Sequence, residues 1–132
     1  MPIKNIFEFN RSIIDATKDL VCAYKPNLAF YDSLGDEGAE AMQRTLVHLR
    51  NVAPKIPIIA DAKRGDVPST SIFHARTIFH VWGFDAVTVN PYGGKDSIEP
   101  FLHYEDKGIF IWCKSSNKGA RDIQDLLVID SE

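Results

Sequence analysis

The sequence predicts an α/β fold in which parallel strands alternate with helices. Helical patterns and short apolar runs follow one another along the whole chain. Strands that are apolar throughout are typical of parallel sheets whose faces are covered by helices. No low-complexity tract or linker interrupts the alternation, which predicts one domain over residues 1–132.

The residues that follow each predicted strand favour one of two architectures. A doubly wound open sheet and a (β/α)8 barrel (TIM barrel) both alternate strands with helices, but barrels collect polar side chains from many strand ends at one face. Every predicted strand here ends in polar or charged residues, and no glycine-rich phosphate loop follows any of them. A complete barrel needs about 250 residues, whereas the chain has 132. The sequence therefore predicts a partial (β/α)8 barrel of about four parallel βα units.

The first half of the chain contains two amphipathic helical patterns separated by a strand. The stripe of the first helix consists of Phe9, Ile13, Ala16 and Leu20. An apolar run then predicts a strand over residues 20–27, with a polar end. A second helix is predicted to begin at Gly35, where acidic residues suit the positive end of the helix dipole. Its apolar stripe consists of Ala39, Met42, Leu46 and Leu49.

The second half of the chain repeats this alternation. Strands are predicted over residues 56–60, 86–89 and 108–113. After the first of them, Ser69 or Thr70 can cap a helix, whose apolar stripe consists of Ile72, Ala75, Phe79 and Trp82. The remaining elements are a loop over 90–94, a short helix over 97–103, a loop over 114–119 and the start of a helix over 121–128.

Composition excludes several classes of protein. The formal net charge is −3 and the basic residues are scattered, so no footprint for nucleic acid or an anionic membrane surface is present. No apolar run is long enough to span a bilayer and the N-terminus does not resemble a signal peptide, so we expect a cytoplasmic protein. Cys22 and Cys113 lie in apolar runs, which predicts buried, reduced thiols rather than a disulfide.

The strongest candidate site follows the strand over residues 56–60. Asp61, Lys63, Arg64 and Asp66 come directly after this apolar run. Side chains alternate along a strand, so Asp61 and Lys63 should point the same way, roughly 7 Å apart. Charges near a buried strand end must be held by one another, and the carboxyl end of a parallel strand is where α/β proteins place their sites. A structural ion pair is the alternative interpretation.

These residues carry a resemblance to a known family. Residues 61–70 read Asp-Ala-Lys-Arg-Gly-Asp-Val-Pro-Ser-Thr, which resembles the Asp-x-Lys-x-x-Asp-(Ile/Val)-x-x-Thr signature of orotidine 5′-phosphate decarboxylases. Three further segments resemble the longer bacterial subgroup of that family, in the same order: residues 14–30, 85–92 and 113–117. The chain departs from the usual pattern at Val67, where Ile is commoner, and at Lys118, where Pro is usual.

The resemblance implies a (β/α)8 barrel enzyme. Such a carbon–carbon lyase converts orotidine 5′-monophosphate to uridine 5′-monophosphate in de novo pyrimidine biosynthesis, with no metal and no organic cofactor. The resemblance also implies a homodimer that binds this small nucleotide, and neither nucleic acid nor membrane. The family's first strand, with an Asp that holds the ribose, and its last three strands, with the phosphate-binding Gln and Arg, are expected to lie outside this chain. The isolated chain is therefore expected to have little or no activity.

The same resemblance assigns roles to four charged residues. Lys63 is implied to donate the proton to C6 of the pyrimidine ring, and Asp61 is implied to face the departing carboxylate. Lys25 is implied to pair with Asp61 near the ribose. Asp66 is implied to reach the site from the partner subunit, which completes an alternating Lys-Asp-Lys-Asp array in which opposite charges stabilise each other.

Four further residues are expected to contact the substrate: Ser116, Thr70, Asn27 and Asn117. Ser116 is implied to read the pyrimidine edge, since a hydroxyl both donates and accepts hydrogen bonds. Thr70 is implied to contact the ribose from the partner subunit, and a helix cap is its alternative interpretation. Asn90 is interpreted as a loop residue. The four histidines have no partner at metal-ligand spacing, so no metal site is predicted.

Two other functions stay open. A metal-dependent sugar-phosphate decarboxylase or aldolase of the same barrel superfamily shares the Asp-x-Lys-x-x-Asp motif. It requires a Mg²⁺-binding carboxylate at the preceding strand, where this chain has Lys25. A non-catalytic half-barrel subunit that assembles with a complementary chain would instead expose two strand edges and an apolar interior.

Overall fold

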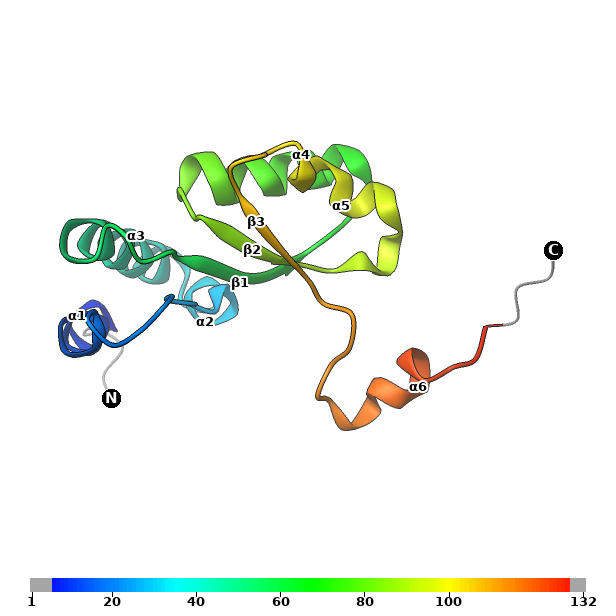
Figure 1. The fold of residues 1–132 in the computed structure, drawn as a ribbon, viewed down its shortest axis with the longest axis horizontal. Helices are drawn as coiled ribbons and strands as arrows, with labels where there is room; N and C mark the ends of the chain where they lie inside the picture. The colour runs from blue at the N-terminus through cyan, green and yellow to red at the C-terminus, as the bar shows by residue number, and fades with distance from the viewer. Residues whose placement is uncertain (1–5, 129–132) are drawn as a thin grey trace.

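The computed structural model describes residues 6–128, and these form an α/β fold (Figure 1). The sheet contains three parallel strands in chain order, namely β1 (Ile59–Arg64), β2 (Ala86–Val89) and β3 (Gly108–Ile111). Each strand pairs with the next along the chain, and helix lies in both connections, as in successive units of a barrel. The predicted α/β class and partial-barrel topology are confirmed. The predicted domain of residues 1–132 extends beyond the described residues at both ends.

The strand expected over residues 20–27 is reduced to two isolated parallel bridges. Tyr24 pairs with Ile58, and Asn27 pairs with Asp61. The carbonyl of Pro26 accepts a hydrogen bond from the Asp61 amide at 3.0 Å, but proline has no N–H to return one. The segment therefore lies along the outer edge of β1 without forming a continuous ladder. It still brings Lys25 beside the end of β1.

The helices of the described chain are α1 (Ile6–Thr17), α2 (Leu28–Asp32), α3 (Gly35–Val52), α4 (Pro68–Arg76), α5 (Lys95–Leu102) and α6 (Arg121–Gln124). α4 continues into a π-helical turn, Thr77–Val81, and 3₁₀ turns occupy Pro91–Gly93 and Lys118–Ala120. Figure 1 shows α4 and α5 side by side along the strands and α1 next to α3. The predicted helix start at Gly35 is confirmed.

The core lies between the strands and the helices that cover them. Its largest fully buried side chains include Leu49, Ile58, Ile78, Phe84, Val87, Val89 and Phe101. The rings of Phe79 and Phe101 meet edge to face with their centroids 6.5 Å apart, a favourable arrangement for aromatic pairs. Val87 and Val89 thus hold β2 in the core, whereas Thr88 between them is only half-buried.

The apolar stripe predicted for the first helix is wrong. Leu20 lies beyond the end of α1 and is 81% exposed, and Phe9 and Ile13 are about half exposed. The buried residue of α1 is Ile14. Its neighbour in packing is Asn10, whose amide donates hydrogen bonds to the Tyr31 hydroxyl at 2.8 Å and to Thr45 at 3.1 Å. A polar residue thus occupies the face that packs on α2 and α3, which a search for apolar periodicity does not reveal.

The stripe predicted for the second helix is confirmed except at its first member. Met42, Leu46 and Leu49 of α3 are buried, but Ala39 is exposed and Gly38 is buried instead.

The helix after β1 also differs from its prediction. It begins at Pro68 with Val67 at the cap position, so neither Ser69 nor Thr70 is the cap. Its buried residues are Ser71 and Ala75, whereas Ile72 is 54% exposed. The Ser71 hydroxyl donates to the Ser97 carbonyl of α5 at 2.7 Å, and this bond orients α4 with Ser71 inward.

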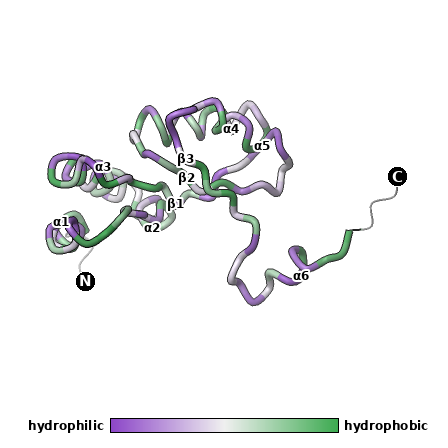
Figure 2. The backbone as a smooth tube through the Cα atoms, viewed as in Figure 1, coloured by the Kyte–Doolittle hydropathy of each residue, from purple (hydrophilic) through white to green (hydrophobic). Residues whose placement is uncertain are grey.

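Three predictions near the ends of elements are also corrected. Cys22 and Cys113 are free thiols, as predicted, but both are exposed, because Cys22 lies in the connection after α1 and Cys113 lies beyond the end of β3. The last predicted helix is limited to α6. Figure 2 shows a hydrophobic stretch after α6, and the side chains there, Leu126, Leu127 and Val128, are exposed.

Among residues 6–128, no helix is both long and apolar enough to cross a membrane.

Gly65 joins β1 to α4 at a point of close backbone approach. The Asn90 amide, just after β2, donates to the Arg64 carbonyl at 2.8 Å. A Cβ atom on residue 65 would lie 2.2 Å from the carbonyl oxygen of Asn90, which is less than van der Waals contact. Only glycine allows the two chains to approach this closely. The end of β1, with its charged residues, is thereby held against β2.

We expect Gly65→Ala to lower the free energy of unfolding by roughly 1–3 kcal/mol, because the added methyl group must push two backbone segments apart. Gly119→Ala is the matched control, since its Cβ would lie 3.3 Å from the flexible Asp122 carboxylate. The control should stay within about 0.5 kcal/mol of the parent. Urea unfolding followed by circular dichroism measures both. Equal stability of the two variants would contradict the close approach at Gly65.

Candidate active site

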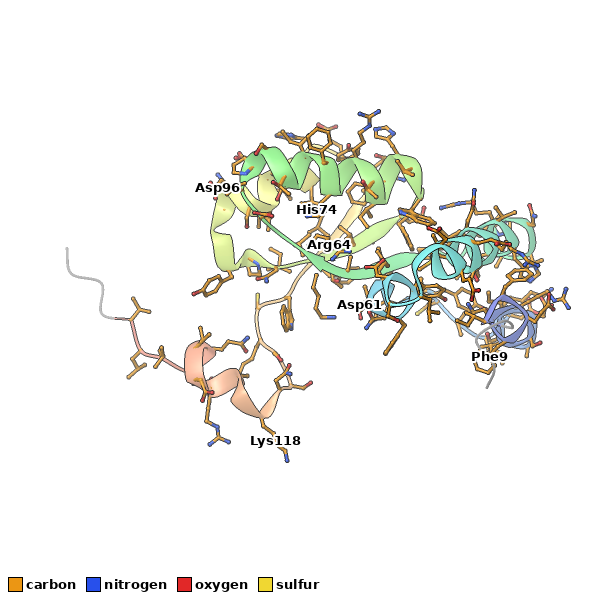
Figure 3. All side chains as sticks on the ribbon, turned by 180° about the vertical axis from the view of Figure 1, so that it is seen from behind. Phe9, Asp61, Arg64, His74, Asp96 and Lys118 are labelled. Atoms are coloured by element: carbon orange, nitrogen blue, oxygen red, sulfur yellow. The ribbon has the colours of Figure 1, made fainter. Side chains whose placement is uncertain are left out.

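Three charged residues meet at the carboxyl end of β1. The Asp61 carboxylate accepts a hydrogen bond from Lys25 Nζ at 2.8 Å on one oxygen and from Lys63 Nζ at 2.5 Å on the other. Lys25 comes from the extended segment beside β1, and Lys63 comes from β1 itself. Figure 3 labels Asp61 along β1, with Arg64 further along the same strand. Each carboxylate oxygen is therefore held by its own ammonium group.

Lys63 reaches Asp61 through an irregularity of the strand. The pairing of β1 with β2 shifts between Ala60 and Arg64, and Lys63 has a φ of +47°. Such a left-handed conformation is unfavourable for a residue with a side chain and costs of order 1–3 kcal/mol. Bulges of this kind change the direction of a side chain next to a site. The prediction that Asp61 and Lys63 come together is confirmed, but regular alternation is not the reason.

The electrostatics of the three residues follow from their burial. The Asp61 side chain is 10% exposed, whereas the side chains of Lys25 and Lys63 are 51% and 38% exposed. Burial alone would raise the pKa of the Asp61 carboxyl, but the hydrogen bonds and charges of Lys25 and Lys63 outweigh it and lower the pKa to about 2. Asp61 is therefore ionised at neutral pH. The two ammonium groups remain open to a bound anion.

Two of the predicted residues lie on the turn and helix that follow β1. Asp66 is exposed, and its carboxylate accepts a hydrogen bond from the Val67 amide at 2.7 Å. Among the described residues it makes no ion pair with Lys25 or Lys63. Thr70 lies in the first turn of α4 and is half-buried. The single chain thus does not complete the four-residue array, and Asp66 and Thr70 stay predictions.

Of the other predicted substrate residues, Asn27 lies beside Asp61 in a parallel bridge, whereas Ser116 and Asn117 lie on a separate segment after β3. Asn27 caps α2, with its side-chain oxygen accepting from the Ala29 amide at 3.1 Å. Ser116 and Asn117 are exposed on the segment between β3 and α6, and Figure 3 shows the neighbouring Lys118 far from Asp61. Asn117 is hydrogen-bonded to Ser115. Their roles in substrate binding also stay predictions.

Two residues near the cluster were missed in the sequence. The Thr88 hydroxyl contacts the backbone of Ala62 and Lys63 and the carboxylate of Asp61, and the ring of Trp112 lies 5.8 Å from Lys63 Nζ. A signal was available for Thr88, because it is the one hydroxyl residue within the apolar run of β2. Within residues 6–128, no group of three or more His, Cys, Asp or Glu side chains lies close enough to hold a metal ion.

Replacing Lys25 by Met should raise the pKa of Asp61, because one of the two cations is removed while the length of the side chain is kept. In the parent, the stability contributed by the ionised carboxylate is complete above its ordinary pKa of 3.8 and is lost as the pH falls through about 2. Lys25→Met should lose this contribution to stability at a higher pH than the parent does. Carbon-13 NMR of the Asp61 carboxyl measures the titration, with Lys55→Met as control. An unchanged Asp61 titration in Lys25→Met would contradict the pairing.

The chain is similar to known proteins over nearly its whole length. Residues 6–131 match the model of the orotidine 5′-phosphate decarboxylase / HUMPS family. The orotidine 5′-phosphate decarboxylase of Thermomicrobium roseum is 52% identical over 125 residues, which cover 95% of this chain and 43% of that protein. The one from a Roseiflexus species is 50% identical over 127 residues, which cover 96% of this chain and 45% of that protein. The chain thus spans less than half the length of these curated relatives.

A solved structure shares the fold as well as the sequence. The orotidine 5′-monophosphate decarboxylase of Leishmania donovani superposes with a TM-score of 0.86 at 40% identity, over 94% of this chain and 48% of the other. The family match covers all of the residues that form the Asp61 cluster. The chain belongs to the orotidine 5′-phosphate decarboxylase / HUMPS family.

Proposed function

We propose that the chain provides the proton-transfer part of an orotidine 5′-phosphate decarboxylase, which converts orotidine 5′-monophosphate to uridine 5′-monophosphate in de novo pyrimidine biosynthesis. The observation that carries the proposal is the Asp61 carboxylate, which is held by Lys25 and Lys63 on its two oxygens. A cation that is fixed beside an anion at the end of a barrel strand suits a reaction in which negative charge leaves one atom and a proton replaces it.

In the proposed reaction, the bond between C6 of the pyrimidine ring and the carboxylate carbon breaks. Its electron pair stays on C6, and CO2 leaves. An N–H proton of the Lys63 ammonium then transfers to C6, and the neutral amine later regains a proton from water. No carbonyl next to C6 can delocalise the pair, so the positive charge of Lys63 must stabilise the carbanion as it forms.

Asp61 contributes in two ways under this proposal. Its carboxylate fixes Lys63 Nζ at 2.5 Å, so the proton donor is already oriented when the substrate binds. Its negative charge also faces the carboxylate of the substrate, and loss of CO2 relieves that repulsion. Lys25 keeps Asp61 ionised from the opposite side.

The proposal extends to a homodimer in the cytoplasm. Asp66 is exposed on the turn before α4, and the half-buried Thr70 lies in the first turn of that helix, where a second copy of the protein could reach them. We propose that these two residues complete the site of the partner subunit. Phosphate and ribose contacts from further strands of the barrel would supply binding energy that is used at C6.

A metal-dependent sugar-phosphate enzyme is disfavoured by one contact. The strand position where such an enzyme needs a carboxylate ligand holds Lys25, and its ammonium group lies 2.8 Å from an Asp61 oxygen. A divalent cation at Asp61 would have to displace that ammonium and then lie beside Lys63. In a complete barrel that contains this chain, full decarboxylase activity in the presence of a strong chelator would agree with the proposal. Loss of that activity, restored by added Mg²⁺, would contradict it.

The function can be tested in a complete barrel. The matching 125 residues of the Thermomicrobium roseum protein are replaced by this chain, and loss of orotidylate absorbance is followed. The chimera should decarboxylate orotidine 5′-monophosphate, whereas the isolated chain should show little or no activity. A folded chimera without activity would contradict the proposal, because its phosphate-binding strands would come from the relative.

In the same chimera, Lys63→Ala should lower kcat by at least about a thousandfold, because both the proton donor and the cation beside C6 are removed. The affinity for uridine 5′-monophosphate, the product, should change far less, since the phosphate and ribose contacts are intact. Lys55→Ala, an exposed lysine outside the cluster, is the control and should behave like the parent. Equal losses in turnover and product affinity would contradict a role in proton transfer and would indicate that Lys63 only binds the nucleotide.

The shared site makes a separate prediction. Asp66→Ala and Lys63→Ala chimeras should each be inactive alone, yet their mixture should recover some activity, because one site of a heterodimer then holds both an intact Lys63 and an intact Asp66. Subunit exchange is verified independently with two affinity tags. No recovery after verified exchange would contradict a site that two subunits share.

A further inference from the structure

Thr88 lies on β2 directly opposite the irregular part of β1. Its neighbours Val87 and Val89 are fully buried, whereas Thr88 is half-buried and reaches β1 with its hydroxyl. The hydroxyl oxygen accepts from the Ala62 amide at 3.0 Å and from the Lys63 amide at 2.9 Å. Its proton has two acceptors within reach, an Asp61 carboxylate oxygen at 3.2 Å and, further away, the Ala60 carbonyl oxygen at 3.4 Å. A hydroxyl offers one donor and two acceptor positions, so all three are used.

The backbone explains why a hydroxyl is needed at this position. Ala60 pairs with Val87 and Arg64 pairs with Val89, so four steps along β1 correspond to two along β2. The amides of Ala62 and Lys63 fall within this shift and donate to a side chain. Amides left without any partner in a partly buried place cost about 1–3 kcal/mol each. The Thr88 oxygen replaces the missing backbone acceptor for both.

We infer that Thr88 is a positioning residue, whose hydroxyl holds Lys63 in its left-handed conformation and orients the Asp61 carboxylate toward Lys63 Nζ. The inference rests on the proposed function only for its effect on turnover. Without the hydroxyl, the bulge loses the group that bridges its two amides to Asp61. The strand can then relax toward regular pairing, and the side chain of Lys63 is no longer directed toward Asp61.

Substitutions at position 88 separate this role from a structural one. Thr88→Val keeps the branched shape and suits a strand well, but it removes the hydroxyl. Thr88→Ser keeps the hydroxyl and loses only a methyl group. Thr88→Ala and Thr88→Ser differ from each other in the hydroxyl alone, and this pair replaces the valine comparison if Thr88→Val does not fold.

The first test uses NMR on the 132-residue chain and needs no activity. In Thr88→Val, amide hydrogen exchange at Ala62 and Lys63 should accelerate at least about tenfold, and the pKa of Asp61 should rise by about half a unit or more. Thr88→Ser should stay close to the parent in both. Thr77→Val, which removes an exposed hydroxyl bonded to the Phe73 carbonyl, is the control and should change neither. Unchanged exchange and an unchanged Asp61 titration in Thr88→Val would overturn the inference.

The second test uses the chimera with the Thermomicrobium roseum protein. Thr88→Val should lower kcat by roughly 10- to 100-fold while KM changes by less than about threefold, because a misplaced catalytic group slows the chemical step. Thr88→Ser should retain most of the turnover. Equal kcat values for the valine and serine variants would overturn the role in turnover. An inactive parent chimera would contradict the proposed function alone, and the NMR comparison would still decide whether Thr88 positions Lys63 and Asp61.

Discussion

The Asp61 carboxylate imposes the constraint on which the rest of the site depends. A carboxylate that is 10% exposed stays ionised only if nearby cations offset its lost hydration. Lys25 and Lys63 provide that offset, one on each oxygen. The two lysines come from the residue 24–27 segment and from β1, and Thr88 of β2 also contacts the carboxylate, so the geometry of this one anion requires these three segments to lie close together. The stability of the fold and the proposed proton transfer therefore both depend on the ionised Asp61 carboxylate.

Several local features of the chain serve this arrangement. Pro26 interrupts the pairing along the outer edge of β1 while its carbonyl still accepts a hydrogen bond from the Asp61 amide, so Lys25 is held beside the strand. Gly65 lets the end of β1 approach Asn90. Between them, Thr88 satisfies the amides of the bulge that turns Lys63 toward Asp61. The strain of a left-handed lysine is thus confined to the one residue whose side chain is proposed to transfer a proton.

The sequence predicted the parts of this structure that depend on residue type and local period. The α/β order, the strand ends and the proximity of Asp61 and Lys63 follow from apolar runs that stop at charged residues, whereas the pairing of Lys25 with Asp61 was implied by the family resemblance. The bulge could not be predicted, because a strand period assumes regular pairing, whereas the shifted amides of Ala62 and Lys63 donate to a hydroxyl on another strand. The half-buried Asn10 and the buried Ser71 were missed because each faces inward through hydrogen bonds with other helices. Asp66, Thr70, Ser116 and Asn117 make no hydrogen bond or ion pair with the Asp61 side chain within the described chain, so their roles at the site stay predictions.

The central claim is that Lys63, oriented by Asp61, exchanges a proton with C6 of the bound pyrimidine. Proton transfer is reversible, so a complete barrel that contains this chain should exchange the C6 hydrogen of uridine 5′-monophosphate for deuterium in D2O. Proton NMR of the nucleotide measures this exchange without any decarboxylation. We predict exchange at C6 with the parent, and none above the uncatalysed rate with Lys63→Ala, at nucleotide concentrations that saturate both proteins. Exchange at C6 that continues unchanged without the Lys63 ammonium group would contradict the claim.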